Sequence, residues 1–168
     1  MASISRSSIL TTVVVVTLVA AVPGAIRRYH QTGTIYMFSQ RFFEDVMARF
    51  SGPGRFRFVM QPLVSIFLAR RDGLSDARSG LPPFLLGLIY HSAHRVGMLR
   101  TAIASVRDLV AIAILLDVIS QFLIFRQVNP FAALLIGPVL IALPYSVTRA
   151  VTNGIVSRRA GATAPPAI

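Results

Sequence analysis

The feature that most constrains this chain is the apolar run from Ile103 to Phe125, which is long enough to cross a bilayer as an α-helix. It carries a single carboxylate, Asp117, near its centre. The whole chain has 168 residues, of which 54% are hydrophobic and only 14% are charged, so it has too much apolar surface for water. We therefore expect an all-α membrane protein that forms a single membrane domain over residues 1–168.

Two further apolar runs are long enough to cross a bilayer, which gives about three transmembrane helices in all. The first covers residues 8–26 and is followed by Arg27-Arg28. We interpret it as a retained span, with a cleaved signal peptide as the alternative. The last covers residues 130–148, directly after a short turn that contains Arg126.

The segments between these spans are expected to form shorter helices. Residues 34–50 place phenylalanines at helical spacing and predict an amphipathic helix, which lies in the headgroup plane or packs on other protein. Residues 56–90 contain two apolar runs, 59–69 and 81–90, that are too short to cross a bilayer. Because the polar residues 70–80 lie between them, we expect a re-entrant helical hairpin that turns at this loop.

A basic helix before the central span and a tail after the last span complete the expected architecture. A basic amphipathic helix over residues 91–106 should run into the central span at 103–125, with a kink or short break near Arg107-Asp108. The tail, residues 157–168, is expected to be disordered because it is short, polar and terminal.

All 17 basic residues are arginine, and six acidic residues leave a net charge of +11. Because the arginines lie beside apolar segments, they favour anionic lipid headgroups over nucleic acid as the partner. The interleaved Arg55-Phe56-Arg57-Phe58 could bind single-stranded nucleic acid, but the uncharged run after it favours an interfacial anchor. The arginines expected to bind headgroups are Arg55, Arg57, Arg70, Arg71, Arg78, Arg95 and Arg100.

The same arginines predict an orientation. If the segment between the first two spans is cytoplasmic, most arginines lie inside and Arg126 lies outside, as the positive-inside rule favours. We therefore expect a multi-pass protein of the bacterial cytoplasmic membrane, with three spans, the N-terminus outside and the C-terminus in the cytoplasm.

Asp117 is the sharpest candidate site. At helical spacing it shares a polar stripe with Ser120 and Gln121, and counting from the turn places it near Gly137-Pro138 on the last span. We expect a neutral acid that donates to the Leu134 carbonyl, which Pro138 leaves without its usual N–H partner. A proton or cation relay is one interpretation. A hydrogen bond that joins helices is favoured, because the span cores contain no other ionisable group.

The polar loop is the second candidate site. Asp72 and Asp76, four apart and beside three arginines, could hold a metal ion and a phosphate. Part of the loop resembles the D-G-x-x-A-R motif of CDP-alcohol phosphotransferases, with three residues in place of two before Ala77-Arg78 and without the family's later pair of carboxylates. The favoured interpretation is a salt-bridged turn.

The sequence predicts no cofactor, no metal site and no catalytic residue. His91 and His94 are too few ligands for a metal, so interfacial histidines are favoured. Cysteine is absent, which excludes disulfides, thiolate ligands and cysteine nucleophiles.

One pattern resembles known proteins. It reads Arg57-Phe58-x-x-Gln61-Pro62-Leu63, then Arg71-Asp72-Gly73-x-x-Asp76-Ala77-Arg78-x-Gly80-x-Pro82-Pro83, then Leu116-Asp117. Over about residues 55–148 it is similar to a group of short bacterial integral membrane proteins. The resemblance implies the membrane class and a bacterial origin, and it implies no activity.

Three functional hypotheses follow in order of preference. The first is a non-catalytic accessory or structural subunit that docks to other membrane proteins of a larger complex. The second is a homo-oligomeric channel or transporter with Asp117 in its pathway. The third is a lipid-acting enzyme that uses the loop of Asp72 and Asp76.

Overall fold

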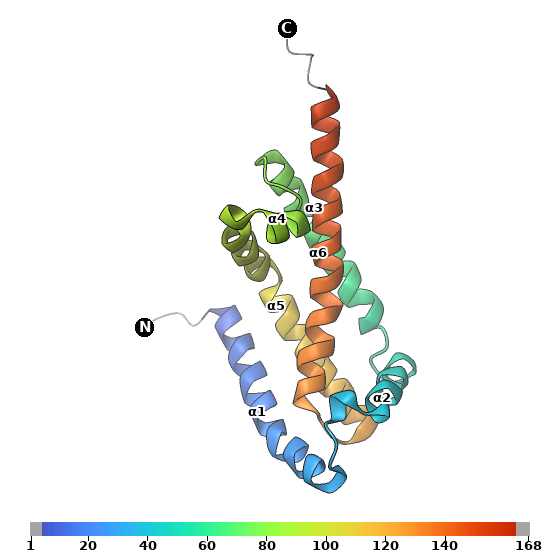
Figure 1. Ribbon diagram of the computed structural model, residues 1–168. Coiled ribbons are helices and arrows are strands. Elements are labelled where there is room, and N and C mark those ends of the chain that lie inside the picture. The colour runs from blue at the N-terminus through green and yellow to red at the C-terminus, as the bar shows by residue number, and fades with distance from the viewer. Residues whose placement is uncertain (1–4, 164–168) are drawn as a thin grey trace. The chain divides into compact units, whose positions relative to one another are not determined.

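The computed structural model describes residues 5–163, and in that range it is helical and contains no strand (Figure 1). Its elements are α1 (Arg6–Thr32), the 3-10 helix η1 (Tyr36–Phe38), α2 (Gln40–Ser51), α3 (Arg57–Arg78), α4 (Phe84–Tyr90), α5 (Ser92–Phe125) and α6 (Pro130–Thr163). Three helices, α1, α5 and α6, are long and apolar enough to cross a membrane. The all-α class and the presence of three helices able to cross a membrane are therefore confirmed.

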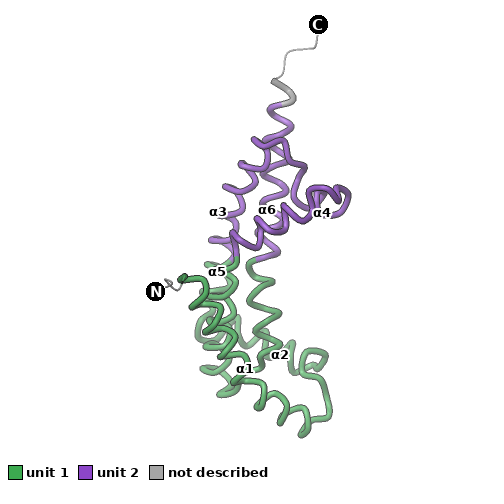
Figure 2. The backbone as a smooth tube through the Cα atoms, turned by 90° about the vertical axis from the view of Figure 1, so that its left-hand side faces the viewer, with its two compact units in different colours: residues 1–61, 107–141 green, residues 62–106, 142–168 purple. Residues whose placement is uncertain are grey.

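The chain divides into two compact units, which Figure 2 colours separately. Unit 1 comprises residues 1–61 and 107–141, and unit 2 comprises residues 62–106 and 142–168. Helices α3, α5 and α6 each contribute residues to both units. The prediction of a single membrane domain stays a prediction.

Local turn chemistry explains where several helices begin and end. Gly33 ends α1 with a φ of 64°, and its N–H donates to the Tyr29 carbonyl. Gly80, with a φ of 67°, follows α3, and the Leu81 N–H donates back to the Asp76 carbonyl in a Schellman-type closure. The Asn129 side chain accepts the backbone N–H groups of the second and third residues of α6 and so caps that helix.

In unit 1, small side chains bring α5 and α6 together. The buried cluster consists of Val14, Ala111, Ile114, Val118 and Ala133. A Cβ atom added at Gly137 would lie 2.9 Å from the backbone nitrogen of Ile114, so only glycine allows this approach.

Helices α1 and α5 run in the same direction in unit 1. At one end, the Ser7 hydroxyl donates to Asp108 at 2.6 Å, and at the other end the Arg28 guanidinium donates to the Gln127 side chain. Figure 1 shows both helices descending together. The expected three-span path requires these consecutive spans to cross the membrane in opposite directions; how each helix crosses a membrane stays a prediction.

The parallel arrangement gives a labelling prediction. The chain has no cysteine, so Gln31→Cys and Gln127→Cys each introduce one unique thiol on an exposed residue. We expect a membrane-impermeant maleimide to label both thiols from the same side, and a thiol in Ser5→Cys from the opposite side. Labelling of residues 31 and 127 from opposite sides would restore the three-span path.

Several boundaries differ from the sequence-based predictions. The predicted loop over residues 70–80 is wrong, because α3 continues to Arg78 and contains Pro62. Pro82 and Pro83 precede α4. Helix α5 continues through Arg107 without the break that was predicted there.

The predicted helix over 34–50 begins later and the last helix ends later than expected. After η1, the extended Ser39 precedes α2, which ends at Ser51 as the following Gly-Pro-Gly sequence indicates. Residues 157–163 of the predicted disordered tail continue α6, and the rest of that tail lies outside the described residues.

In unit 2, Gly73 sets the approach of α3 to α6. A Cβ atom at this position would lie 2.7 Å from the Arg149 carbonyl oxygen and 2.9 Å from the Thr152 Cβ. The Asp-Gly pair that resembled a phosphotransferase motif therefore contains a packing glycine within a helix.

Gly73→Ala should destabilise the protein by about 1–3 kcal/mol, because the backbone of α6 cannot move aside cheaply. Gly97→Ala is the matched control, since no atom lies within 4 Å of its added Cβ. The control should be neutral or gain up to about 1 kcal/mol from helix propensity. Thermal unfolding in detergent, followed by circular dichroism, measures both, and equal stability of the two variants would refute the packing role.

Candidate functional sites

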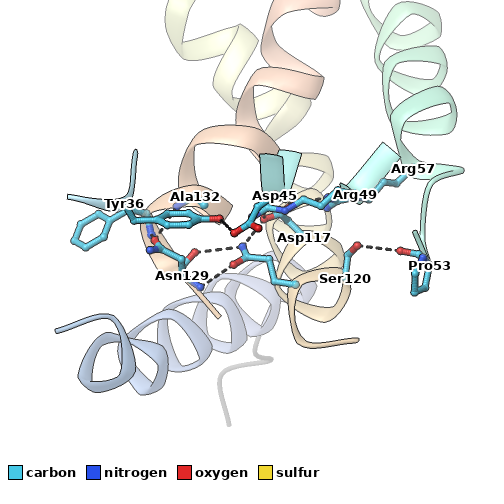
Figure 3. A network of polar contacts seen from close by, with 11 residues as sticks. Tyr36, Asp45, Arg49, Pro53, Arg57, Asp117, Ser120, Asn129 and Ala132 are labelled. Atoms are coloured by element: carbon cyan, nitrogen blue, oxygen red, sulfur yellow. Dashed lines mark hydrogen bonds and ion pairs between the residues drawn. The ribbon is translucent and has the colours of Figure 1, made fainter. Parts of the chain in front are cut away.

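The main polar site of unit 1 is built around Asp117 on α5 (Figure 3). Arg57, the first residue of α3, places its Nη2 2.6 Å from the Asp117 Oδ1. Arg49 of α2 places its Nη1 3.4 Å from the same oxygen. The three side chains are at most 1% exposed, so one carboxylate holds two guanidinium groups inside the protein.

The stripe that follows Asp117 connects α5 to the neighbouring turns. Gln121 donates from Nε2 to the Asp117 Oδ2 at 2.6 Å, and its Oε1 accepts the Asn129 N–H at 2.7 Å. The Ser120 hydroxyl donates to the Pro53 carbonyl at 3.0 Å. The predicted polar stripe thus joins α5 to the α2–α3 loop and to the start of α6.

Hydrogen-bond donors outnumber acceptors in this network. Within the described residues, Nε and Nη2 of Arg49 and Nε and Nη1 of Arg57 are buried without a hydrogen-bond partner. The network therefore depends on its carboxylate.

The expected partner of Asp117 is wrong. Its oxygens contact guanidinium groups and an amide, which are contacts suited to an ionised carboxylate, rather than the Leu134 carbonyl. Local sequence pattern does not relate Asp117 to these partners, because both arginines lie outside the three long apolar helices. One signal was present, since Arg49 interrupts the otherwise apolar end of α2.

The amphipathic helix α2 buries Phe42 and Arg49 and leaves three large apolar side chains at the surface. Phe43, Met47 and Phe50 are 63%, 65% and 51% exposed. An exposed apolar face of this kind is stable when hydrocarbon or another protein covers it.

The carboxylates of the second candidate site are engaged within unit 2. Arg149 of α6 forms a bidentate pair with Asp76, at 2.6 and 2.9 Å. Tyr145 donates its hydroxyl to Asp72 at 2.5 Å and accepts from Arg149 at 3.0 Å. Arg149 also donates to the Thr101 hydroxyl at 3.2 Å and lies over the Phe84 ring.

This arrangement joins α3 to α6 with every guanidinium nitrogen of Arg149 engaged. The salt bridge that sequence analysis favoured is present, but its cation is Arg149 rather than one of the arginines in the predicted loop. Among residues 5–163, no group of three or more His, Asp or Glu side chains is placed to hold a metal ion.

The other predicted site residues lie at the surface. Of the arginines expected to bind headgroups, six are exposed: Arg55, Arg70, Arg71, Arg78, Arg95 and Arg100. Arg57 is the exception, because it is buried against Asp117. His91 and His94 are both exposed.

The network around Asp117 and the pair of Arg149 with Asp76 define a helical membrane protein whose buried charges join helices. No family model matches the chain, and no curated protein or solved structure is similar to it. The function is therefore argued from the residues of these sites and of the surface.

Proposed function

We propose that this chain is a non-catalytic accessory or structural subunit of a larger complex in the bacterial cytoplasmic membrane. The observation that carries the proposal is the burial of Asp117 against Arg49 and Arg57. A carboxylate held this way joins helices, whereas a channel or relay needs it accessible to water or to a moving ion. The exposed apolar face of α2 supports the same role, since it offers a surface to another membrane subunit.

The enzyme hypothesis receives less support from the geometry. A metal-dependent reaction on lipid phosphates needs free carboxylate oxygens, and both oxygens of Asp76 already accept from Arg149. The proposal therefore assigns no catalytic residue and no cofactor. It retains anionic headgroups as partners of the exposed arginines along residues 70–100.

The proposed topology follows from the parallel pair α1 and α5. Two parallel spans require the segment between them to cross the membrane an odd number of times. Helix α3 is the remaining helix of sufficient length, with 22 residues or about 33 Å. With a cytoplasmic C-terminus, this path places the N-terminus on the cytoplasmic side as well, and the maleimide labelling described above tests it.

Purification of the tagged protein from its native membranes tests the proposed role. We expect other polypeptides to co-purify at a fixed ratio, as native mass determination would report. Phe43→Ser combined with Met47→Ser should reduce that association, whereas the control Leu85→Ser with Ile89→Ser, on the exposed side of α4, should not. A homo-oligomer of this chain alone would refute the subunit role and favour the channel.

A further inference from the structure

A groove between α1 and α5 ends in a cluster of arginines. The cavity, about 500 Å³ in volume, lies within unit 1. Its lining residues are Thr17, Ala20, Ala21, Gly24, Arg27, Arg28, Gln31, Val118, Phe122, Arg126, Gln127 and Val128. None of them is acidic, so three guanidinium groups border the cavity without a carboxylate in its lining.

The groove is apolar along the spans and cationic at the helix ends, which matches the positions of acyl chains and headgroups in a bilayer. Small residues of α1 and the Val118 and Phe122 side chains line the part that lies along the spans. From Thr17 to Arg28 the helix rises by about 16 Å, which is comparable to much of a lipid acyl chain. The arginines follow at the helix ends, where a bilayer places its headgroups.

The cationic end is held in place by local contacts. Arg28 donates to the Gln127 side chain and lies 5.8 Å from the centre of the Tyr36 ring. Arg126 adopts a positive φ of 54° and lies 5.9 Å from the centre of the Phe122 ring. Fixed guanidinium groups lose little freedom when they bind, and their paired N–H groups match the oxygens of a phosphate.

We propose that this groove binds one anionic phospholipid, with an acyl chain along α1 and α5 and the phosphate on Arg27, Arg28 and Arg126. The site exists only because α1 and α5 are parallel, which brings arginines almost 100 positions apart in the sequence to one membrane surface. It is separate from the exposed arginines of residues 70–100 and independent of the proposed role as a subunit.

Native mass spectrometry of the purified protein in mild detergent tests the site. We expect one dioleoyl phosphatidylglycerol to be retained about tenfold or more in preference to dioleoyl phosphatidylcholine. Combined Arg27→Gln, Arg28→Gln and Arg126→Gln should remove this preference. The triple variant Arg6→Gln, Arg41→Gln and Arg158→Gln loses the same charge at exposed arginines to which no lipid is assigned, and it should keep the preference.

A second variant tests the apolar part without changing charge. Gly24 lines the groove and has no atom within 4 Å of an added Cβ, so Gly24→Leu adds apolar volume at the cavity wall from an unhindered Cβ. We expect it to reduce lipid retention about tenfold with unchanged circular dichroism, whereas Gly97→Leu, which is equally unhindered, retains the lipid.

Three outcomes would overturn the proposal. Equal retention of the two lipids would remove the role of charge, and unchanged retention in Gly24→Leu would remove the groove as the site. Full competition by free glycerol phosphate would assign the arginines to a soluble phosphate ester rather than to a lipid.

Discussion

Asp117→Asn is expected to destabilise the protein by about 3–5 kcal/mol, because it leaves two buried guanidinium groups without their carboxylate. The amide that replaces the carboxylate has no charge to offset the burial of Arg49 and Arg57. Unfolding by heat or denaturant in detergent, followed by circular dichroism, measures the loss.

Asp108→Asn is the control for this prediction, since its ion pair with Arg107 is about half exposed and should contribute less than about 1 kcal/mol. The triple variant Asp117→Leu, Arg49→Met and Arg57→Met removes all three charges and should recover part of the stability. If Asp117→Asn and Asp108→Asn unfold alike, Asp117 does not hold the arginines in place.

Arg149→Lys should cost about 3 kcal/mol, although it keeps the positive charge. Lysine cannot form the bidentate pair with Asp76 while also donating to Tyr145 and Thr101. The same unfolding measurement applies, and the separation of α3 from α6 is reported by increased proteolysis within residues 62–78.

Arg158→Lys provides the comparison for this second prediction, because Arg158 is exposed and its replacement should leave the midpoint nearly unchanged. The double variant Asp76→Leu with Arg149→Met should be more stable than Arg149→Lys, since it leaves no buried charge unpaired. A fully stable Arg149→Lys would show that the bidentate geometry does not matter.

At the buried network of Asp117, the sequence was enough to predict the polar residues of α5 but not the arginines that pair with them. Asp117, Ser120 and Gln121 were identified because a 3.6-residue period places them on one side of a helix that is otherwise apolar. Their partners were not identified, because Arg49 and Arg57 are 68 and 60 positions away, and nothing in local pattern relates them to Asp117. Charge pairing across such distances depends on which helices pack together.

The loop predicted over residues 70–80 failed for a related reason. Its charged residues and Gly73 suggested a solvated turn, since isolated glycine and clustered charge disfavour a buried helix. In the structure the glycine permits close packing against α6, and Arg149 neutralises Asp76. Tertiary contacts therefore stabilise a helix that local propensity does not favour.

Hydropathy and segment length were enough to predict the membrane class, the all-helical architecture and the three long apolar helices, because both are local properties of the chain. The direction of α1 beside α5, the partners of Asp117 and the grouping of Arg27, Arg28 and Arg126 could be learned only from the three-dimensional arrangement. These depend on packing between segments distant in the chain, and an apolar run has the same composition whichever way it crosses the membrane.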